Sequence, residues 1–182
     1  VPGKFHYDSD IETKLPQKVA LGTSWQATSR LRLSAQADWI NWADAFDKLN
    51  VHLSNGSNPA INGLLQSNKI DDTINLDWKD RFVYRAGAEY ALTGTLTLRA
   101  GYAYGKSPVP DQTLLPMTAA ISEHTLGIGL GYNGGSYHVD LGYQRDLNAT
   151  QHAGSGITGT EYDNSTVNIS ANWLALTLGF NF

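Results

Sequence analysis

The stretch that decides the fold is the C-terminal run Asn172–Phe182, which reads NWLALTLGFNF. Every second residue from Leu174 to Phe182 is apolar, whereas the residues between them are small or polar. Successive side chains of a β-strand point to opposite sides of the sheet, so this alternation predicts a strand with one apolar face.

Two interpretations of this strand are open from the run itself. It is either the closing strand of a bacterial outer-membrane β-barrel or an edge or core strand of a soluble β-sandwich. Chain ends in water usually fray, and a strand that is apolar up to the terminal residue Phe182 therefore favours the barrel.

Composition excludes several classes of protein. The formal net charge is −4 and no basic run occurs, so a nucleic-acid partner is not expected. The chain has no cysteine, which excludes disulfides and thiolate sites. It also lacks an apolar run of about 18 residues, so a transmembrane helix is excluded and a barrel is the remaining way to span a bilayer.

The same alternation recurs along the chain and predicts seven long strands and a short N-terminal stub. Residues 30–54 lose the alternation between Asn41 and Asp47, and we interpret them as one strand with a bulge near Trp42, not as two strands and a turn. The seven predicted strands are 11–26, 30–54, 81–91, 96–104, 124–132, 137–143 and 167–182.

Connections of alternating length support the one-strand interpretation of 30–54. Short turns are predicted at 27–30, 92–95 and 133–135, and long loops at 54–73, 107–119 and 148–164. Outer-membrane barrels have short turns on the periplasmic side and long loops outside. Within the first long loop, Ile61, Leu64 and Leu65 have helical spacing and predict a short amphipathic turn of helix.

The two faces of the predicted strands differ in chemistry. Aromatic residues near the strand ends of the apolar face are typical of the girdles at membrane interfaces; they are Trp25, Trp39, Phe82, Tyr90, Tyr102, Tyr104, Tyr132 and Tyr143. The opposite face would line a polar lumen, although a sandwich could expose it to water; its charged or ionisable residues are Arg32, Asp38, Arg85, Glu89, Arg99, His138 and Asp140.

The number of strands indicates an incomplete barrel. Single-chain bacterial barrels have even strand numbers, and seven strands leave two unpaired edges, which lipid does not tolerate. We therefore expect an all-β chain that supplies about seven antiparallel strands of a larger barrel. A second segment or chain is expected to close it.

Several stretches together resemble the long-chain fatty acid transporter (FadL, toluene/xylene transporter) family of outer-membrane proteins. They are Lys14-Leu15-Pro16 with Val19-Ala20-Leu21-Gly22, Trp39-Ile40-Asn41-Trp42 with Phe46, the run 78–90 (WKDRFVYRAGAEY), the run 98–104 (LRAGYAY) leading to 107–111 (SPVPD), and the terminal Phe182. Their order and spacing extend over nearly the whole chain.

The resemblance implies a fourteen-stranded barrel, of which residues 1–182 match the C-terminal half. It implies uptake of hydrophobic molecules such as long-chain fatty acids across the bacterial outer membrane, by diffusion through the barrel without chemistry. The partners so implied are outer-membrane lipid, the N-terminal half as another segment or chain, and a hydrophobic small-molecule ligand.

Enzymatic function is not expected from the sequence. The five histidines are scattered, no G-x-S-x-G motif occurs, and no metal-ligand spacing is present. We therefore expect no catalytic residue, no metal site and no cofactor. The alternative function is a small structural or adhesive outer-membrane barrel.

Candidate ligand contacts lie on the lumen face and in the outside loops. Arg85 and Arg99 are candidates for binding a carboxylate, because a guanidinium binds one through two hydrogen bonds; the alternative is that they pair with Glu89, Asp38 or Asp140. The lumen candidates are Arg85, Arg99, Arg32 and His138. The loop candidates for guiding a ligand, with loop packing as the alternative, are Leu64, Leu65, Leu114, Leu115 and Met117.

Overall fold

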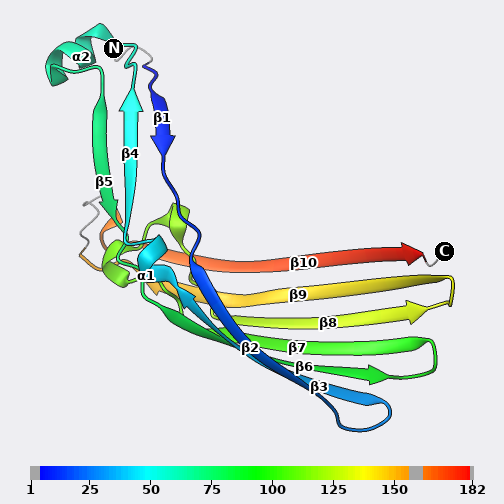
Figure 1. The fold of residues 1–182 in the computed structure, drawn as a ribbon. Coiled ribbons are helices and arrows are strands. Elements are labelled where there is room, and N and C mark those ends of the chain that lie inside the picture. Colours follow the sequence, from blue (N-terminus) through cyan, green and yellow to red (C-terminus); the bar gives the residue numbers. More distant parts are fainter. Residues whose placement is uncertain (1–4, 156–161, 181–182) are drawn as a thin grey trace.

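The computed structural model describes residues 5–155 and 162–180, and most of them form antiparallel strands. Seven strands form one sheet in the order β10-β9-β8-β7-β6-β3-β2, drawn in Figure 1 as a long curved wall. They are β2 (Gln17–Gln26), β3 (Leu31–Asn41), β6 (Arg81–Ala91), β7 (Leu96–Gly105), β8 (His124–Asn133), β9 (Tyr137–His152) and β10 (Thr166–Phe180). The prediction of seven wall strands is confirmed.

Strand pairing aligns apolar residues in rows that cross several wall strands. Leu130 of β8 lies opposite Leu98 of β7 and Leu141 of β9, and Leu141 lies opposite Leu176 of β10. We call this side the apolar face; its side chains are widely exposed, Leu176 to 64%. The other side, the polar face, carries Asp38, Arg85 and the residues in register with them.

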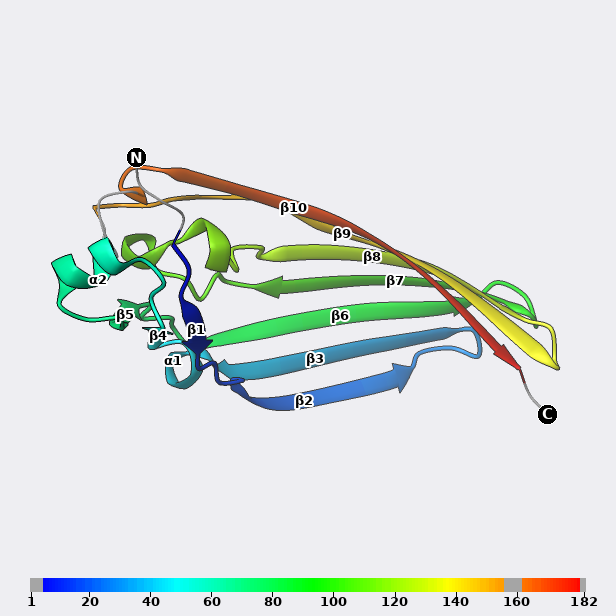
Figure 2. The ribbon, with the colours of Figure 1, turned by 90° about the horizontal axis from the view of Figure 1, so that it is seen from above.

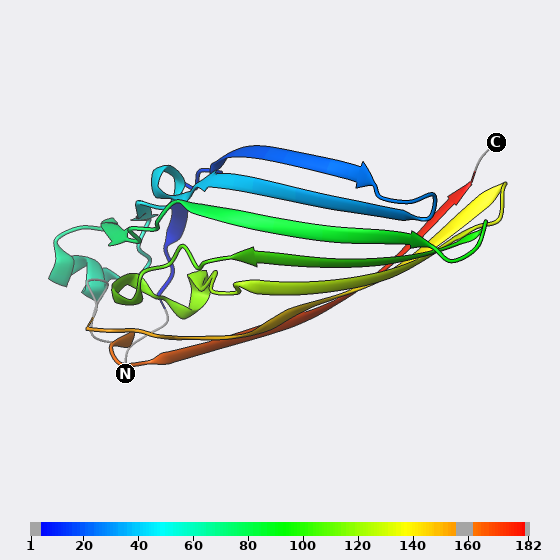
Figure 3. The same cartoon turned by 90° about the horizontal axis from the view of Figure 1, so that it is seen from below.

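The wall is curved along its whole width. Figures 2 and 3 show it from two opposite sides, with β2 and β10 at its two edges. None of the helices among the described residues is long and apolar enough to cross a bilayer.

A second, three-stranded sheet stands at one end of the wall. It has the order β1-β4-β5 and consists of β1 (Asp8–Ile11), β4 (Lys48–Ser54) and β5 (Ile70–Asn75). Helix α2 (Pro59–Leu65) connects β4 to β5 at the tip of this sheet (Figure 1). The predicted helical turn is confirmed, and the Asn58 side chain caps it by accepting from the Ala60 amide at 3.0 Å.

The prediction of one strand over 30–54 is wrong. Strand β3 ends at Asn41, helix α1 (Trp42–Ala45) follows, and β4 belongs to the second sheet. The Asn41 side chain accepts from the Asp44 amide, which caps α1 and stops the extended backbone. The lost alternation therefore marks a helical turn and not a bulge, and the wall keeps seven strands because β4 leaves it.

Smaller boundary differences have local causes. The first wall strand starts at Gln17 and not at residue 11, because residues 8–11 pair with β4 as β1 and Pro16 precedes the wall. Of the N-terminal stub and turn predicted within residues 1–10, the described part forms a strand only from Asp8, where β1 begins. Strand β9 also extends to His152 and β10 begins at Thr166, so the start of the predicted loop 148–164 belongs to β9. The predicted end of the last strand at Phe182 lies outside the described residues.

The short turns all lie at the end of the wall opposite the second sheet (Figure 1). Backbone hydrogen bonds close them, such as Ala27 N to Leu31 O at 2.9 Å and Gly134 N to Tyr137 O at 2.8 Å. Gly135 has φ +86°, which a glycine adopts without strain. The alternation of short turns and long connections is therefore confirmed, but the prediction of a loop up to residue 73 is wrong, because β5 begins at Ile70.

The long-loop end contains a buried core, which we call the cap cluster: Leu76, Trp78, Val109, Leu114, Ile121 and Ala153. Phe46 stacks on Trp78, with ring centroids 4.5 Å apart, so the residues after α1 join this core. Between Ile169↔Ala149 and Ala171↔Asp146, β9 has one extra residue. This bulge allows Ala149 to pack against the cap cluster.

Candidate functional site

The polar face gathers most of the charged residues of the wall. Alternate residues of every wall strand reach it, as the register of Gln36, Arg85 and Ala103 illustrates. Its charged or ionisable residues are Lys18, Arg32, Asp38, Arg81, Arg85, Glu89, Arg99, His138, Asp140 and Asp146. Two groups of them form continuous networks.

The first network surrounds Asp38, whose side chain is fully buried. Lys18 Nζ of β2 lies 3.0 Å from its Oδ2, and Gln36 Nε2 donates to Oδ1 at 2.6 Å. Arg85 of β6 donates to the same carboxylate. A buried carboxylate is tolerated only when it is paired and hydrogen-bonded, so this network joins β2, β3 and β6 on the polar face.

The second network is a chain of four charged residues. Glu89 accepts from Arg32 Nη2 at 2.5 Å through Oε1 and from Arg99 Nε at 2.7 Å through Oε2. Arg99 Nη1 then donates to Asp140 Oδ1 at 2.6 Å. The chain extends from β3 to β9, and two cations face two anions, so it is neutral as a whole.

Gly131 makes the second network geometrically feasible. A Cβ atom at this position of β8 would lie 2.6 Å from Asp140 Oδ1 and 2.7 Å from Arg99 Nη1. Because real Cβ atoms do not approach so closely, a side chain at this position would push the Arg99 and Asp140 end groups aside, and the glycine leaves room for their pairing as it stands. Sequence reasoning missed this role, since the alternating glycines of β8 gave no sign of which charges they separate.

The four predicted lumen residues do not converge on one point. Arg85 belongs to the Asp38 network, whereas Arg32 and Arg99 share Glu89. His138 stands apart, near the short-turn end, with its ring over Gly179 of β10. Ion pairing, the alternative left open for Arg85 and Arg99, is present; a ligand contact by these residues stays a prediction.

A groove of about 430 Å³ runs along the polar-face side of β7 to β10. Glycines 101, 127, 129 and 142 form much of its wall, and Arg99 and Trp173 border it. Trp173 Nε1 donates to Asp146 Oδ2 at 3.1 Å, which holds the indole on this face. Trp173 was missed as a site residue. The available signal was that this large aromatic residue shares its strand face with the small or polar residues Ala175 and Thr177.

The loop candidates separate into buried and exposed residues. Leu114 belongs to the cap cluster with 1% exposure, and Leu115 packs against that cluster. Leu114 therefore offers no surface to a ligand in this conformation, and loop packing is what the structure shows for it. Leu64 is 84% exposed on α2, and Leu65 is also exposed; the Met117 side chain lies outside the described residues.

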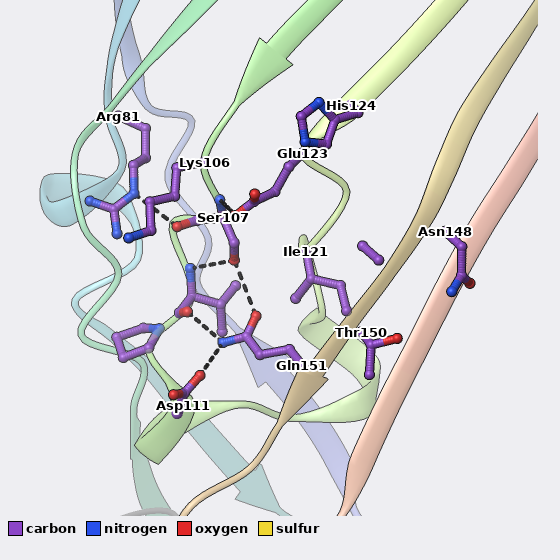
Figure 4. Close-up of a pocket in the computed structure, with 13 residues that line it drawn as sticks. Arg81, Lys106, Ser107, Asp111, Ile121, Glu123, His124, Asn148, Thr150 and Gln151 are labelled. Carbon is purple, nitrogen blue, oxygen red and sulfur yellow. Dashed lines mark hydrogen bonds between the residues drawn. The ribbon is translucent and has the colours of Figure 1, made fainter.

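Figure 4 shows a cavity of about 440 Å³ between the connection that follows β7 and the long-loop part of β9. Hydrogen bonds fix its wall: the Ser107 carbonyl accepts from Arg81 Nε at 2.8 Å, and the Ser107 amide donates to Glu123 at 3.0 Å. Gln151 Nε2 of β9 donates to the Val109 carbonyl at 2.8 Å. The connection is thereby tied to the wall strands on both sides.

The described residues contain no cluster of three or more histidine, aspartate or glutamate side chains that could hold a metal ion. The charged residues of the two networks are paired with each other. Glycine, aromatic and amide residues border the groove together with Arg99, whereas the cavity of Figure 4 is also lined by charged side chains such as Arg81 and Glu123. The groove and the cavity can therefore bind a small molecule non-covalently or let it move along them.

Comparison with known proteins agrees with this geometry. The model of the family described as "Outer membrane protein transport protein (OMPP1/FadL/TodX)" matches residues 1–182. No curated protein matches the sequence.

Solved structures with the same fold include two proteins named as toluene transporters and a FadL homologue. The P. putida toluene transporter TodX is 22% identical with a TM-score of 0.70, over 97% of this chain and 37% of TodX. The Ralstonia pickettii toluene transporter TbuX is 17% identical with a TM-score of 0.66, over 96% and 36%. A Pseudomonas aeruginosa FadL homologue is 19% identical with a TM-score of 0.62, over 93% and 35%. The chain therefore spans little more than a third of these structures.

Proposed function

The chain belongs to the outer membrane protein transport protein family, and we propose that it forms part of the wall of a β-barrel channel for hydrophobic small molecules. The channel lies in the bacterial outer membrane and lets its ligand diffuse inward without chemical change. The observation that carries this proposal is the seven-strand apolar face, uncovered within the described chain, opposite a polar face of paired charges.

Partner strands are part of the proposal. Among the described residues, β2 hydrogen-bonds only to β3 and β10 only to β9 within the wall. Unpaired backbone groups cost several kcal/mol each in hydrocarbon. We propose that a further segment or chain, equivalent to the N-terminal half of the barrel, pairs with both edges and completes about fourteen strands.

The ligand class follows from the interior. The Glu89 chain is neutral as a whole, so the interior around this chain offers little attraction for a charged solute. Two similar structures are named as toluene transporters. Both points support an uncharged hydrophobic molecule, such as an aromatic hydrocarbon, as a ligand.

A carboxylate-bearing ligand such as a long-chain fatty acid is the second candidate. Arg99 favours it, because its side chain borders the groove between β7 and β10 although it is ion-paired. A fatty acid could exchange one of the two carboxylates of this pairing for its own head group. Arg85 would be the corresponding contact nearer the long-loop end.

Reconstitution tests the channel proposal. The chain alone and the chain together with the segment that completes the barrel are refolded into liposomes, and uptake of radiolabelled toluene and of a long-chain fatty acid is measured. We expect uptake only for the completed barrel. If the chain alone closes into a barrel in detergent and transports nothing, the small structural or adhesive barrel replaces the proposal.

The choice between ligand classes rests on Arg99→Ala in the completed barrel. If Arg99 contacts a carboxylate, fatty acid uptake falls about tenfold, the scale of one lost charge-assisted hydrogen bond, whereas toluene uptake changes little. The matched control is Arg32→Ala, which removes another ion pair to Glu89 without bordering the groove. Equal losses for both ligands would leave Arg99 as a structural brace.

A further inference from the structure

One cation lies on the wrong side of the wall for a lumen role. Arg145 of β9 pairs in register with Leu126 of β8 and with Asn172 of β10, which places it on the apolar face. Within the seven wall strands as described, it is the one lysine or arginine on that face.

Arg145 also differs in its partners from the three arginines of the two polar-face networks. Arg32, Arg85 and Arg99 are each paired with a carboxylate. Arg145 has no acidic partner among residues 5–155 and 162–180, and its Nη1 donates at 3.2 Å to the Asn172 side-chain oxygen. The residue is exposed, and the bond to Asn172 uses one of the five N–H donors of the guanidinium.

The side chains around Arg145 hold it in place. The Tyr143 hydroxyl donates to the same Asn172 oxygen at 2.7 Å, so the tyrosine and the arginine converge on one amide. One position further along β8 on this face is His124, whose Nδ1 lies 2.6 Å from the Tyr102 hydroxyl. Polar tips of aromatic and basic residues thus gather where the apolar rows end.

The depth of this group identifies its surroundings. His124 is the first residue of β8 at the long-loop end, and long loops lie outside the cell in outer-membrane barrels. A cation costs about 2–4 kcal/mol at the bilayer midplane but little at the interface. Arg145 therefore lies at the headgroup level of the outer leaflet, provided that the barrel proposed above is correct.

We propose that Arg145, with Asn172 and Tyr143, binds a phosphate of the phosphorylated glycolipid headgroup in the outer leaflet. The guanidinium presents a fork that matches two phosphate oxygens. Asn172 holds one edge of that fork and leaves the others for the ligand, and the leucine rows below accept the acyl chains. Charge complementarity commits the site to an anionic lipid and its depth to the outer leaflet.

Native mass spectrometry of the completed barrel in detergent tests this site with diphosphoryl lipid A as the probe. Arg145→Gln is expected to lower the bound fraction about tenfold, the scale of a lost charged hydrogen bond, and Asn172→Ala to lower it less. Lys48→Gln, the same charge change at an exposed position of β4 in the second sheet, is the matched control and keeps wild-type binding. Dephosphorylated lipid A should bind equally to wild type and to Arg145→Gln.

Two results would overturn the proposal: unchanged diphosphoryl lipid A binding by both Arg145→Gln and Asn172→Ala, or equal competition by phosphatidylglycerol. Equal competition would mean that Arg145 only reaches the membrane surface and attracts any anionic lipid there. Toluene uptake into liposomes free of lipid A tests the barrel separately. Uptake that persists in Arg145→Gln while lipid A binding is lost supports the headgroup site and leaves the channel proposal intact.

Discussion

The seven-stranded wall and the region of the cap cluster place apolar and charged side chains in opposite ways. In the wall, leucines such as Leu176 lie outside and charges such as Asp38 lie inside, where Asp38 is fully buried. In the cap, Leu76 and Trp78 are buried, and partly buried apolar side chains pack around them. The wall is inverted because lipid covers its apolar face, whereas the cap follows the rule of water-soluble proteins.

The contrast teaches where stability comes from in each region. Hydrogen-bonded strand pairing and polar-face ion pairs hold the wall, and the apolar face contributes only when lipid covers it. Burial of side chains holds the cap, since Leu76 is only 1% exposed. The boundary lies near α1, where the backbone leaves the sheet after Asn41.

The largest expected effect places a charge on the apolar face. Ile128→Arg, in the middle of β8, should destabilise the assembled barrel in lipid by about 4 kcal/mol, the upper range for an arginine at the bilayer midplane. Urea unfolding in lipid vesicles measures it. Thr177→Arg, on the polar face opposite Asp140, is the control and should change stability by less than about 1 kcal/mol. Equal costs at both positions would contradict the assignment of faces.

A cavity in the cap should cost somewhat less. Leu76→Ala removes a fully buried side chain and is expected to lower stability by about 3 kcal/mol, with faster proteolysis of the loops around it. Leu64→Ala, on exposed α2, should leave stability nearly unchanged. A loss of ligand uptake by Leu64→Ala at unchanged stability would support the predicted guiding role of this residue.

The smallest effect concerns pH in the second sheet. The hydrogen bond between His52 Nδ1 of β4 and Asp71 of β5, 2.8 Å long, raises the pKa of His52 above the ordinary histidine value. A raised pKa stabilises the folded β4–β5 pair below the ordinary histidine pKa, and this contribution is lost as pH rises through the folded-state pKa.

Titration of the His52 ring by NMR checks the direction of this shift. Asp71→Asn should lower the midpoint, because it removes the negative partner. Asp72→Asn, which changes the neighbouring charge but no contact to His52, should lower it less. A midpoint that does not move in Asp71→Asn would separate the shift from this hydrogen bond.

The sequence predicted the wall well because its signal is local. Alternation of apolar residues, as in the run ending at Phe180, needs only the two-residue period of a strand. The alternation of short turns and long loops then predicted that successive wall strands are antiparallel neighbours, without information on contacts between distant residues. The same reasoning failed at Trp42, because a helical turn and a bulge interrupt the alternation alike, and what distinguishes them is packing of Trp42 against the distant Trp78.

The candidate site was predicted only in part. The polar face and its arginines follow from strand parity, but parity cannot say that Arg99 reaches Asp140 across Gly131, or that Arg145 falls opposite Asn172. These pairings join residues more than 25 positions apart, so they depend on the register of neighbouring strands. Register itself is fixed by turns and by the β9 bulge, which flips the parity beyond Asp146.

The sequence by itself determined that this chain is a set of two-faced strands with short turns on one side and long loops on the other. Local side-chain alternation and turn chemistry suffice for that. Only the tertiary structure decided that β1, β4 and β5 leave the wall, which charges neutralise each other, and which leucines are buried. Those outcomes depend on contacts between segments far apart in the chain, and such contacts exist only once the strands are in register.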